Sequence, residues 1–531
     1  MMHPMFKKEH HHWLLRIFLF AVYLVNGFFY IPRQSIVSDE LDHSSYSFRF
    51  IKGHPQKIRP YDDGSTMPIT ALNTLPRIIE QTIHPGLKKN DNGASDIING
   101  RYITLLLSIF IGVYILIWAK ELYGEAAATF SLFLFVFCPN LNAQTGFVAT
   151  DAYAALFTII SAYYFWKWQK NGGWKNLLFF SLALGLAQLT KQSLSILVVV
   201  FFLLFFFFWF KEKGAAAGIK RKAFQLFVSI FLVLFVINAG FLFCDSFMPL
   251  GAYQFKSHSF NNLQTSLSVI RNLPLPLPSP YLYGLDLVKR MTEMDPGDSR
   301  VSLGNYILGE KRNTGGFWYY YFIILLFKTP LVIIVGGIVL LWNFRPAGNK
   351  NFFTNEFIIL VLIASFFIFF NFMVKRQVGI RHILIIYPLI YVLLGRLVLL
   401  AESKLQSKLI RGSVIIYSVC TFYFFFPNLI AYSNELVIDK KDAYKIFADS
   451  NLDWGQGKEY LKKFLKTNKS VEIPGPVPKA GKFIVSSNDY VGLNNDPDIS
   501  WIRRFEPADE VHFSYLFFDI TEQDLQKYNF K

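Results

Sequence analysis

Long apolar runs separated by short charged loops dominate the pattern of this 531-residue chain. Eleven of these runs are long enough, or nearly so, for a helix that crosses a lipid bilayer, which needs about 20 mostly apolar residues. We expect spans near residues 13–31, 99–118, 126–142, 151–167, 177–190, 193–210, 223–243, 317–342, 355–374, 383–400 and 412–428. The pattern therefore predicts a polytopic α-helical membrane protein with about eleven transmembrane helices.

Three segments are too long or too polar to be simple connections between spans. They are residues 32–98, residues 244–316 and the tail 429–531. Within the tail, residues 458–465 have the period of an amphipathic helix, and two short runs at 482–486 and 511–518 are typical of strands. The sequence thus predicts a transmembrane domain over 1–428, which includes the two long loops, and a small C-terminal α/β domain over 429–531.

Positive residues collect in the short loops after every second predicted span. They lie in four groups, at 167–175, 211–222, 345–350 and 404–411. Because Lys and Arg are enriched in cytoplasmic loops, this arrangement predicts a cytoplasmic N-terminus and an extracytoplasmic C-terminal domain. The net charge of +16 then reflects membrane topology and not nucleic-acid binding. The first span is interpreted as a retained helix, since no small-residue cleavage site follows Tyr30.

An acidic pair, Asp39-Glu40, follows the first span. Carboxylates at a membrane exit are costly to place, and packing does not explain two of them side by side. The first external loop is therefore the place where the sequence indicates chemistry.

Several cations break the charge rule because they lie on the outer side or at membrane depth. They are Arg101, Lys191, Lys328, Arg376 and Arg381. One interpretation pairs them with Asp39, Glu40 or Asp151, or extends their charged heads to the membrane surface. The other makes them ligands of a lipid phosphate, for which Arg offers two parallel hydrogen bonds and Lys a point charge.

Other candidates lie near these charges. Asp151 begins the fourth span on the outer side, where it either caps the helix or orients a cation. His43 and His382 are candidates for positioning the acceptor or the donor. Trp454 lies in the motif DSNLDWGQ, where its ring is a candidate for contact with a sugar. Asp453 in the same motif is expected to cap the helix that starts at Gly455.

An acid beside cations at the outer leaflet fits sugar transfer from a polyprenyl phosphate. The leaving phosphate needs a stabilising charge, and the acceptor hydroxyl must lose a proton. A single carboxylate suffices as general base if the displacement inverts the anomeric centre. The sequence predicts Asp39 as this base, with Glu40 tuning or orienting it and Asp151 completing the acidic group.

The order of these motifs resembles the GT-C superfamily of membrane glycosyltransferases, specifically the bacterial relatives of protein O-mannosyltransferases and aminoarabinose transferases. In that family an acidic pair follows the first helix, and its first Asp is the proposed base, which Asp39 matches. A later Asp, a helix-entry Arg and a Lys after a Gly-containing helix are similar to Asp151, Arg101 and Lys191. Three further segments look like bacterial members of this group: residues 305–330, 379–389 and 449–456.

This resemblance implies a bundle of about eleven helices, a first loop with interfacial helices, and a polyprenyl-phosphate-linked sugar as donor. It also implies a location in the bacterial plasma (inner) membrane. The chain has no room for the inserted β-trefoil domain of the eukaryotic mannosyltransferases. The sugar therefore stays open, as does the acceptor, which is a protein, a lipid or another glycan.

Two other functions use similar groups. A flippase or transporter of polyprenyl-linked glycans favours internal repeats and broken helices at the midplane, whereas here the charges collect on one leaflet. A surface-polysaccharide ligase is expected to carry its main basic loop later, without an early acidic pair. The three cysteines form neither a disulfide framework nor a metal-ligand pattern. No cofactor is assigned, although Asp39, Glu40 and Asp151 leave a divalent cation as an alternative.

Overall fold

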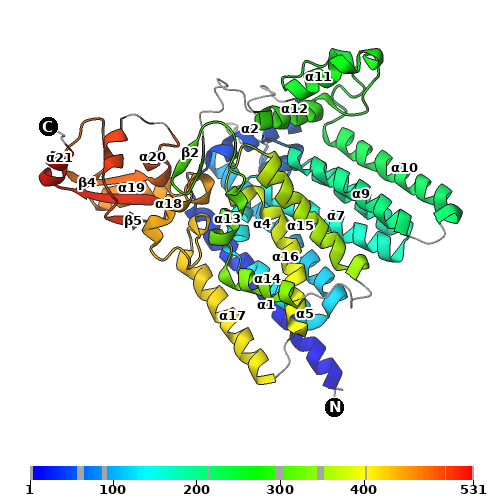
Figure 1. Ribbon diagram of the computed structural model, residues 1–531, viewed down its shortest axis with the longest axis horizontal. Coiled ribbons are helices and arrows are strands. Elements are labelled where there is room, and N and C mark those ends of the chain that lie inside the picture. The colour runs from blue at the N-terminus through cyan, green and yellow to red at the C-terminus, as the bar shows by residue number, and fades with distance from the viewer. Residues whose placement is uncertain are drawn as a thin grey trace.

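The computed structural model describes residues 4–56, 65–85, 93–211, 215–293, 304–343, 352–400 and 404–528 without 495 and 497. A bundle of long helices makes up most of the molecule, and a small sheet domain lies beside it (Figure 1). The bundle helices are α1 Pro4–Tyr30, α4 Ala94–Tyr123, α5 Glu125–Val136, α6 Pro139–Thr145, α7 Asp151–Asn171, α8 Trp174–Gln188, α9 Ser195–Lys211, α10 Ala215–Gly240, α13 Tyr320–Lys328, α14 Leu331–Trp342, α15 Glu356–Ile368, α16 Tyr387–Leu394 and α17 Lys404–Phe425.

The molecule is an integral, multi-pass membrane protein. Among the described residues, six helices are long and apolar enough to cross a bilayer, or eight if each of two bent pairs is one span. The eight coincide with eight of the eleven predicted spans. The remaining three, near 151–167, 177–190 and 383–400, fall outside this count, and α8 with its 15 residues is only about 22 Å long. Eleven spans therefore remain a prediction.

The two bent pairs break at prolines. Helices α5 and α6 meet at 65° before Pro139, and α13 and α14 meet at 112° before Pro330. Proline lacks an N–H and disfavours helix at the residue before it, so the chain turns there. The kink predicted at Pro330 is confirmed, and it places Lys328 at the last turn of α13.

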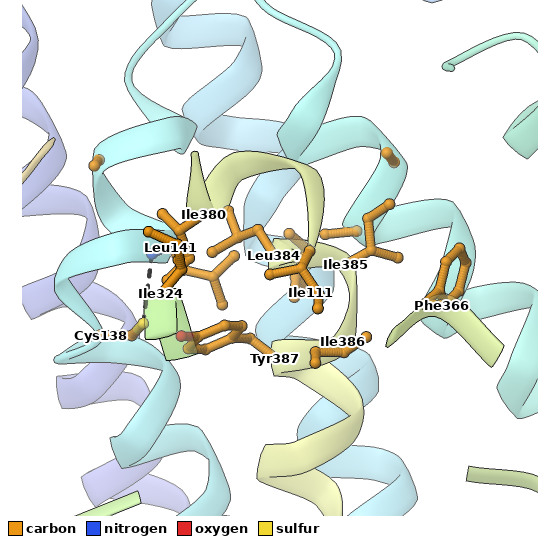
Figure 2. Close-up of a cluster of buried hydrophobic side chains, with 14 of the residues drawn as sticks. Ile111, Cys138, Leu141, Ile324, Phe366, Ile380, Leu384, Ile385, Ile386 and Tyr387 are labelled. Carbon is orange, nitrogen blue, oxygen red and sulfur yellow. Dashed lines mark hydrogen bonds between the residues drawn. The ribbon is translucent and has the colours of Figure 1, made fainter. Parts of the chain in front are cut away.

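The segment that carries Arg381 and His382 is anchored by an apolar core. Its two short turns, η10 Ile380–His382 and η11 Leu384–Ile386, insert their aliphatic side chains among α4, α6, α13 and α15. Figure 2 shows Ile380 and Leu384 facing Leu141 and Ile324 in this cluster. Burying these side chains fixes the backbone of the turn and leaves Arg381 and His382 outside this apolar cluster.

The two long loops are largely helical. The first contains α2 Ser38–Ile51, η2 Pro68–Thr74 and α3 Leu75–Ile83. The second contains η4 Leu250–Ala252, α11 His258–Ser266, η5 Ser268–Ile270, α12 Ser279–Glu293 and the hairpin β1 Asn305–Ile307 with β2 Glu310–Arg312. Both loops lie at the same end of the bundle in Figure 1.

The tail forms a four-stranded sheet in the order β3-β4-β6-β5. Its strands are β3 Val471–Glu472, β4 Gly481–Ser486, β5 Asp509–Val511 and β6 Tyr515–Ile520, and its helices are α18 Ala443–Ile446, α19 Lys458–Thr467, α20 Ser487–Tyr490 and α21 Glu522–Lys527. The amphipathic helix expected at 458–465 is α19. The run 511–518, predicted as one strand, is instead two strands, because His512 and Phe513 both have φ near +57° and reverse the chain.

Candidate functional site

A cavity of about 640 Å³ lies where the end of the bundle that carries the two long loops meets the loop before α19. It is bordered by the start of α2, the turn after α8, the η10 turn and residues 449–458. Six of the residues predicted from the sequence line it: Asp39, Lys191, Arg376, Arg381, His382 and Trp454. Segments more than 400 residues apart in the chain thus contribute to one hollow.

Asp39 and Arg381 form an ion pair on the cavity wall. Asp39 lies in the first turn of α2, and its Oδ2 accepts a hydrogen bond of 2.7 Å from Arg381 Nη1. The Arg381 guanidinium also covers the ring of Trp454, 4.4 Å from its centroid. Arg381 Nε is buried and meets no acceptor in the described part of the chain. The pair is therefore held in place while one donor of Arg381 stays unused.

The surroundings of Asp39 keep it ionised. Burial alone would raise the pKa of Asp39, but the charge and hydrogen bond of Arg381 outweigh burial and lower it. The charge of His43 and a hydrogen bond with Trp454 also lower the pKa of Asp39, by smaller amounts. Burial, together with the charges of Lys191, Arg381 and Arg376, lowers the pKa of His382 well below its ordinary value. At neutral pH the cavity therefore holds a carboxylate and a neutral imidazole.

A second ion pair lies close to the first. Lys191 follows α8 in an extended conformation, and its Nζ is 2.6 Å from Asp151 Oδ1. Asp151 is the first residue of α7, but Thr150 at the N-cap makes no side-chain capping bond. The carboxylate of Asp151 is almost fully buried behind Lys191, whose side chain is 18% exposed and lines the cavity. Asp151 therefore orients the lysine and does not itself line the cavity.

Glu40 and Arg101 form a fully buried pair outside the cavity lining. Arg101 donates to both carboxylate oxygens of Glu40, at 2.8 and 2.6 Å. Its remaining donors bind the backbone carbonyls of residues 31, 34 and 35. Glu40 also accepts from the backbone N–H groups of Val37 and Val148. This network joins the segment between α1 and α2 to Glu40 in α2 and Arg101 in α4, so it fixes the start of α2 and hence the position of Asp39.

Lys328 and His43 are also placed away from the cavity. Lys328 is fully buried, and its Nζ donates to the carbonyls of Ile430 at 2.8 Å and Asn451 at 2.5 Å. His43 is 1% exposed within α2. Lys328 thus links the bundle to the loop that contains DSNLDWGQ.

Sequence reasoning missed the cavity wall that this loop provides. Asp449, Asp453, Lys458 and Asn488 all line the cavity. The expected cap is wrong: α19 begins after Gly457 without a side-chain cap, and Asp453 instead accepts from the N–H of Gly455 at 2.8 Å. The sequence signal for this wall was the high proportion of polar residues in DSNLDWGQ. Within the described residues, no three His, Cys, Asp or Glu side chains are arranged to hold a metal ion.

An apolar groove of about 310 Å³ borders the charged cavity. It runs between α8, α9, α10 and α12 and is lined by side chains such as Phe201, Val233 and Leu285. Two segments border both hollows: the start of α9, with Ser193 on the cavity and Ser195 on the groove, and α12, with Leu285 and Val288. A charged cavity therefore lies next to a hydrocarbon-lined groove.

The chain resembles known proteins in part of its sequence and in its fold. Residues 87–249 match the family of dolichyl-phosphate-mannose-protein mannosyltransferases. The oligosaccharyltransferase AglB of the archaeon Archaeoglobus fulgidus, solved with an inhibitory peptide and a dolichol-phosphate, is 11% identical, with a TM-score of 0.50 over 86% of this chain. This chain spans 60% of AglB. The resemblance to the GT-C superfamily predicted from the sequence is confirmed, and the chain has a GT-C fold.

ArnT from Cupriavidus metallidurans is a further similar structure. Bound to undecaprenyl phosphate, it is 14% identical, with a TM-score of 0.48, over 82% of this chain and 68% of ArnT. In the apo state it is 12% identical, with a TM-score of 0.45, over 96% of this chain and 98% of ArnT. No curated protein sequence gives a significant match to the chain.

Proposed function

We propose that this GT-C protein is an inverting glycosyltransferase that moves a sugar from a polyprenyl-phosphate donor to an acceptor hydroxyl. One observation carries the proposal: a cavity that contains a carboxylate and several cations borders an apolar groove. A lipid-linked phosphosugar has the same division into a charged head and a hydrocarbon tail. We place the reaction at the outer face of a bacterial plasma membrane, with the N-terminus in the cytoplasm.

The cations on the cavity wall suit the donor phosphate. Lys191 offers a point charge, and Arg381 offers a guanidinium whose Nε meets no acceptor in the described part of the chain. Arg376 also lines the cavity, and its guanidinium is 3.9 Å from Asp449, beyond hydrogen-bond distance. The apolar groove beside the start of α9 would take the first isoprene units of the tail.

Asp39 is proposed as the general base. The acceptor oxygen attacks the anomeric carbon, the bond from that carbon to the phosphate oxygen breaks, and its electron pair leaves with the phosphate. The hydroxyl proton passes to Asp39. The ion pair with Arg381 keeps Asp39 ionised but also weakens it as a base. As negative charge grows on the leaving phosphate, Arg381 shifts towards it, so Asp39 becomes more basic when the proton arrives.

The remaining predicted residues take supporting roles. Asp151 orients Lys191 at 2.6 Å, and Trp454 holds Arg381 through its ring. His382, neutral beside these cations, is a candidate for a hydrogen bond with the donor sugar. Arg101, Glu40 and Lys328 lie outside the cavity lining, so we assign them to the scaffold and not to the phosphate or the base.

Transfer by the purified protein tests this function. The full chain in lipid nanodiscs is mixed with a radiolabelled polyprenyl-phosphate sugar and an acceptor extract of the cell envelope. We expect label in the acceptor fraction, released polyprenyl phosphate, and a product whose anomeric configuration is opposite to that of the donor. A product of retained configuration would contradict the single-base mechanism. In sealed vesicles, movement of the labelled lipid across the bilayer without transfer would instead indicate a flippase.

A further inference from the structure

One wall of the cavity belongs to the C-terminal domain, and it is rigidly fixed to the bundle. The loop 449–456 is held by Lys328 Nζ on the carbonyl of Asn451 and by the backbone N–H of Ile380 on Asn451 Oδ1, at 2.9 Å. The N–H of Ser35 also donates to the carbonyl of Gln456 at 2.9 Å. Ile380 directly precedes Arg381, and Ser35 lies four residues before Asp39. These bonds fix the position of the loop relative to the proposed base and the proposed phosphate ligands.

The side chain of Asn488 holds the same loop from the sheet domain. Its Oδ1 accepts from the N–H of Asp449 at 2.7 Å, and its Nδ2 donates to the carbonyl of Asp453 at 2.8 Å. Asp449 has φ of +58°. This conformation costs free energy and persists only where neighbouring groups enforce it. The amide of Asn488 thus fixes both aspartates on the cavity wall.

Asp453 lines the cavity and has one carboxylate oxygen without a hydrogen bond in the described part of the chain. The residue is only 9% exposed and lines the cavity. Its Oδ1 accepts from Gly455, while its Oδ2 accepts no hydrogen bond from any described residue. Lys458 also lines the cavity, and its ammonium makes neither a hydrogen bond nor an ion pair within the described part of the chain. A carboxylate oxygen on a cavity wall that no protein donor occupies is free to accept a hydrogen bond from a ligand.

We propose that this wall is the acceptor subsite and that it takes a carbohydrate, with Asp453 as its main hydrogen-bond acceptor; this rests on the proposed glycosyl transfer. Ionised carboxylates only accept hydrogen bonds, so Asp449 and Asp453 favour the hydroxyl donors of a sugar and disfavour an anionic group at the same position. Trp454 is 9% exposed and Arg381 covers one face of its ring, so little of the ring is left for stacking on a sugar, and polar contacts dominate recognition.

Steady-state kinetics with two acceptor classes test this subsite. The full chain in nanodiscs receives a radiolabelled polyprenyl-phosphate sugar and either oligosaccharides released from the envelope of a strain that lacks the gene, or a mixture of Ser- and Thr-containing peptides. We expect label in the oligosaccharides. Asp453→Ala should raise the KM for the oligosaccharide about 10- to 100-fold, the range for losing a hydrogen bond to a charged group. The donor KM should change less than the acceptor KM.

Glu459→Gln is the matched control. Like Asp453→Asn, it replaces a carboxylate by an amide, here in the neighbouring helix. Glu459 is 61% exposed, pairs with Lys462 and lies outside the cavity. Asp453→Asn keeps the bond to Gly455 and should raise the acceptor KM about tenfold, which decides the question if Asp453→Ala does not fold. Unchanged acceptor KM in the Asp453 variants, or label only in peptides, would overturn the subsite alone. A wild-type protein that neither transfers nor hydrolyses the donor would overturn the glycosyltransferase itself.

Discussion

Asp39 and Glu40 are adjacent in sequence and each pairs with an arginine, yet the structure gives them opposite surroundings. Glu40 and Arg101 are completely buried, and backbone groups complete their hydrogen bonds. Asp39 and Arg381 lie on a cavity wall, with side chains 25% and 14% exposed, and Arg381 keeps an unused donor. Access to the cavity, and not charge or pairing, separates Asp39, the proposed base, from Glu40, which we assign to the scaffold.

Neutralising Asp39, the more exposed of the two acids, is the strongest test of this difference. Asp39→Asn should lower kcat about 10²- to 10⁴-fold, the usual contribution of a general base. Because the pair with Arg381 is partly exposed, the midpoint of thermal unfolding should change little. Transfer of a radiolabelled sugar and unfolding of the same nanodisc sample measure both effects. Asp519→Asn, on an exposed position of β6, is the control. Normal turnover by Asp39→Asn would exclude it as the base.

Neutralising the buried acid should have the reverse effect. Glu40→Gln leaves the Arg101 charge buried without a counter-charge, which costs about 3–5 kcal/mol of folding stability. The double variant Glu40→Leu with Arg101→Met removes both charges and should recover part of this loss. Folded protein yield and thermal unfolding in nanodiscs report stability, while turnover per folded molecule should persist. A fall in kcat with unchanged stability would show that Glu40 tunes Asp39 directly.

The sequence was sufficient to find the fold class, eight of the spans and six of the residues that line the cavity. Hydropathy located the eight spans counted by length and composition, and the charge rule singled out Lys191 and Arg381 as cations in unusual places. The charge rule did not distinguish Arg101 and Lys328, which lie outside the cavity lining, from Lys191 and Arg381, which are part of it. All of these are cations at the membrane boundary, and only tertiary packing decides whether a guanidinium or ammonium meets backbone carbonyls or a cavity.

The C-terminal wall of the cavity was harder to predict for a different reason. Asp449 and Asp453 lie in a loop whose conformation depends on long-range partners, namely Asn488 and Lys328. A local rule such as helix capping gave Asp453 the wrong role, because the helix starts later, after Gly457. Local patterns identify helices, whereas hydrogen bonds between residues tens or hundreds of positions apart cannot be read from them.

A smaller effect is expected at the second ion pair of the cavity. Lys191→Met removes a proposed ligand of the donor phosphate, so the donor KM should rise about 10- to 100-fold with a smaller change in kcat. Asp151→Asn keeps the Lys191 ammonium but removes the carboxylate that orients it. Its effect on the donor KM should therefore be weaker. Lys482→Met, an exposed lysine of β4, is the control. If Lys191→Met lowers stability and leaves the donor KM unchanged, the pair is structural, like that of Glu40.

Asp453 extends the comparison to a third environment, a buried acid without a paired cation. The pKa of Asp453 is raised to about 6, chiefly by burial; Asp489 and Asp449 also raise it, while the Gly455 N–H and Lys458 lower it. Asp453 should therefore lose its charge as the pH falls through 6, and the acceptor KM of the wild type should rise about tenfold between pH 7.5 and 5. The lowered pKa of Asp39 keeps the base ionised across this range. Asp453→Asn resembles the protonated form, so its acceptor KM should match the wild type at pH 5 and stay flat. An equal pH dependence in both proteins would assign the titration to another group.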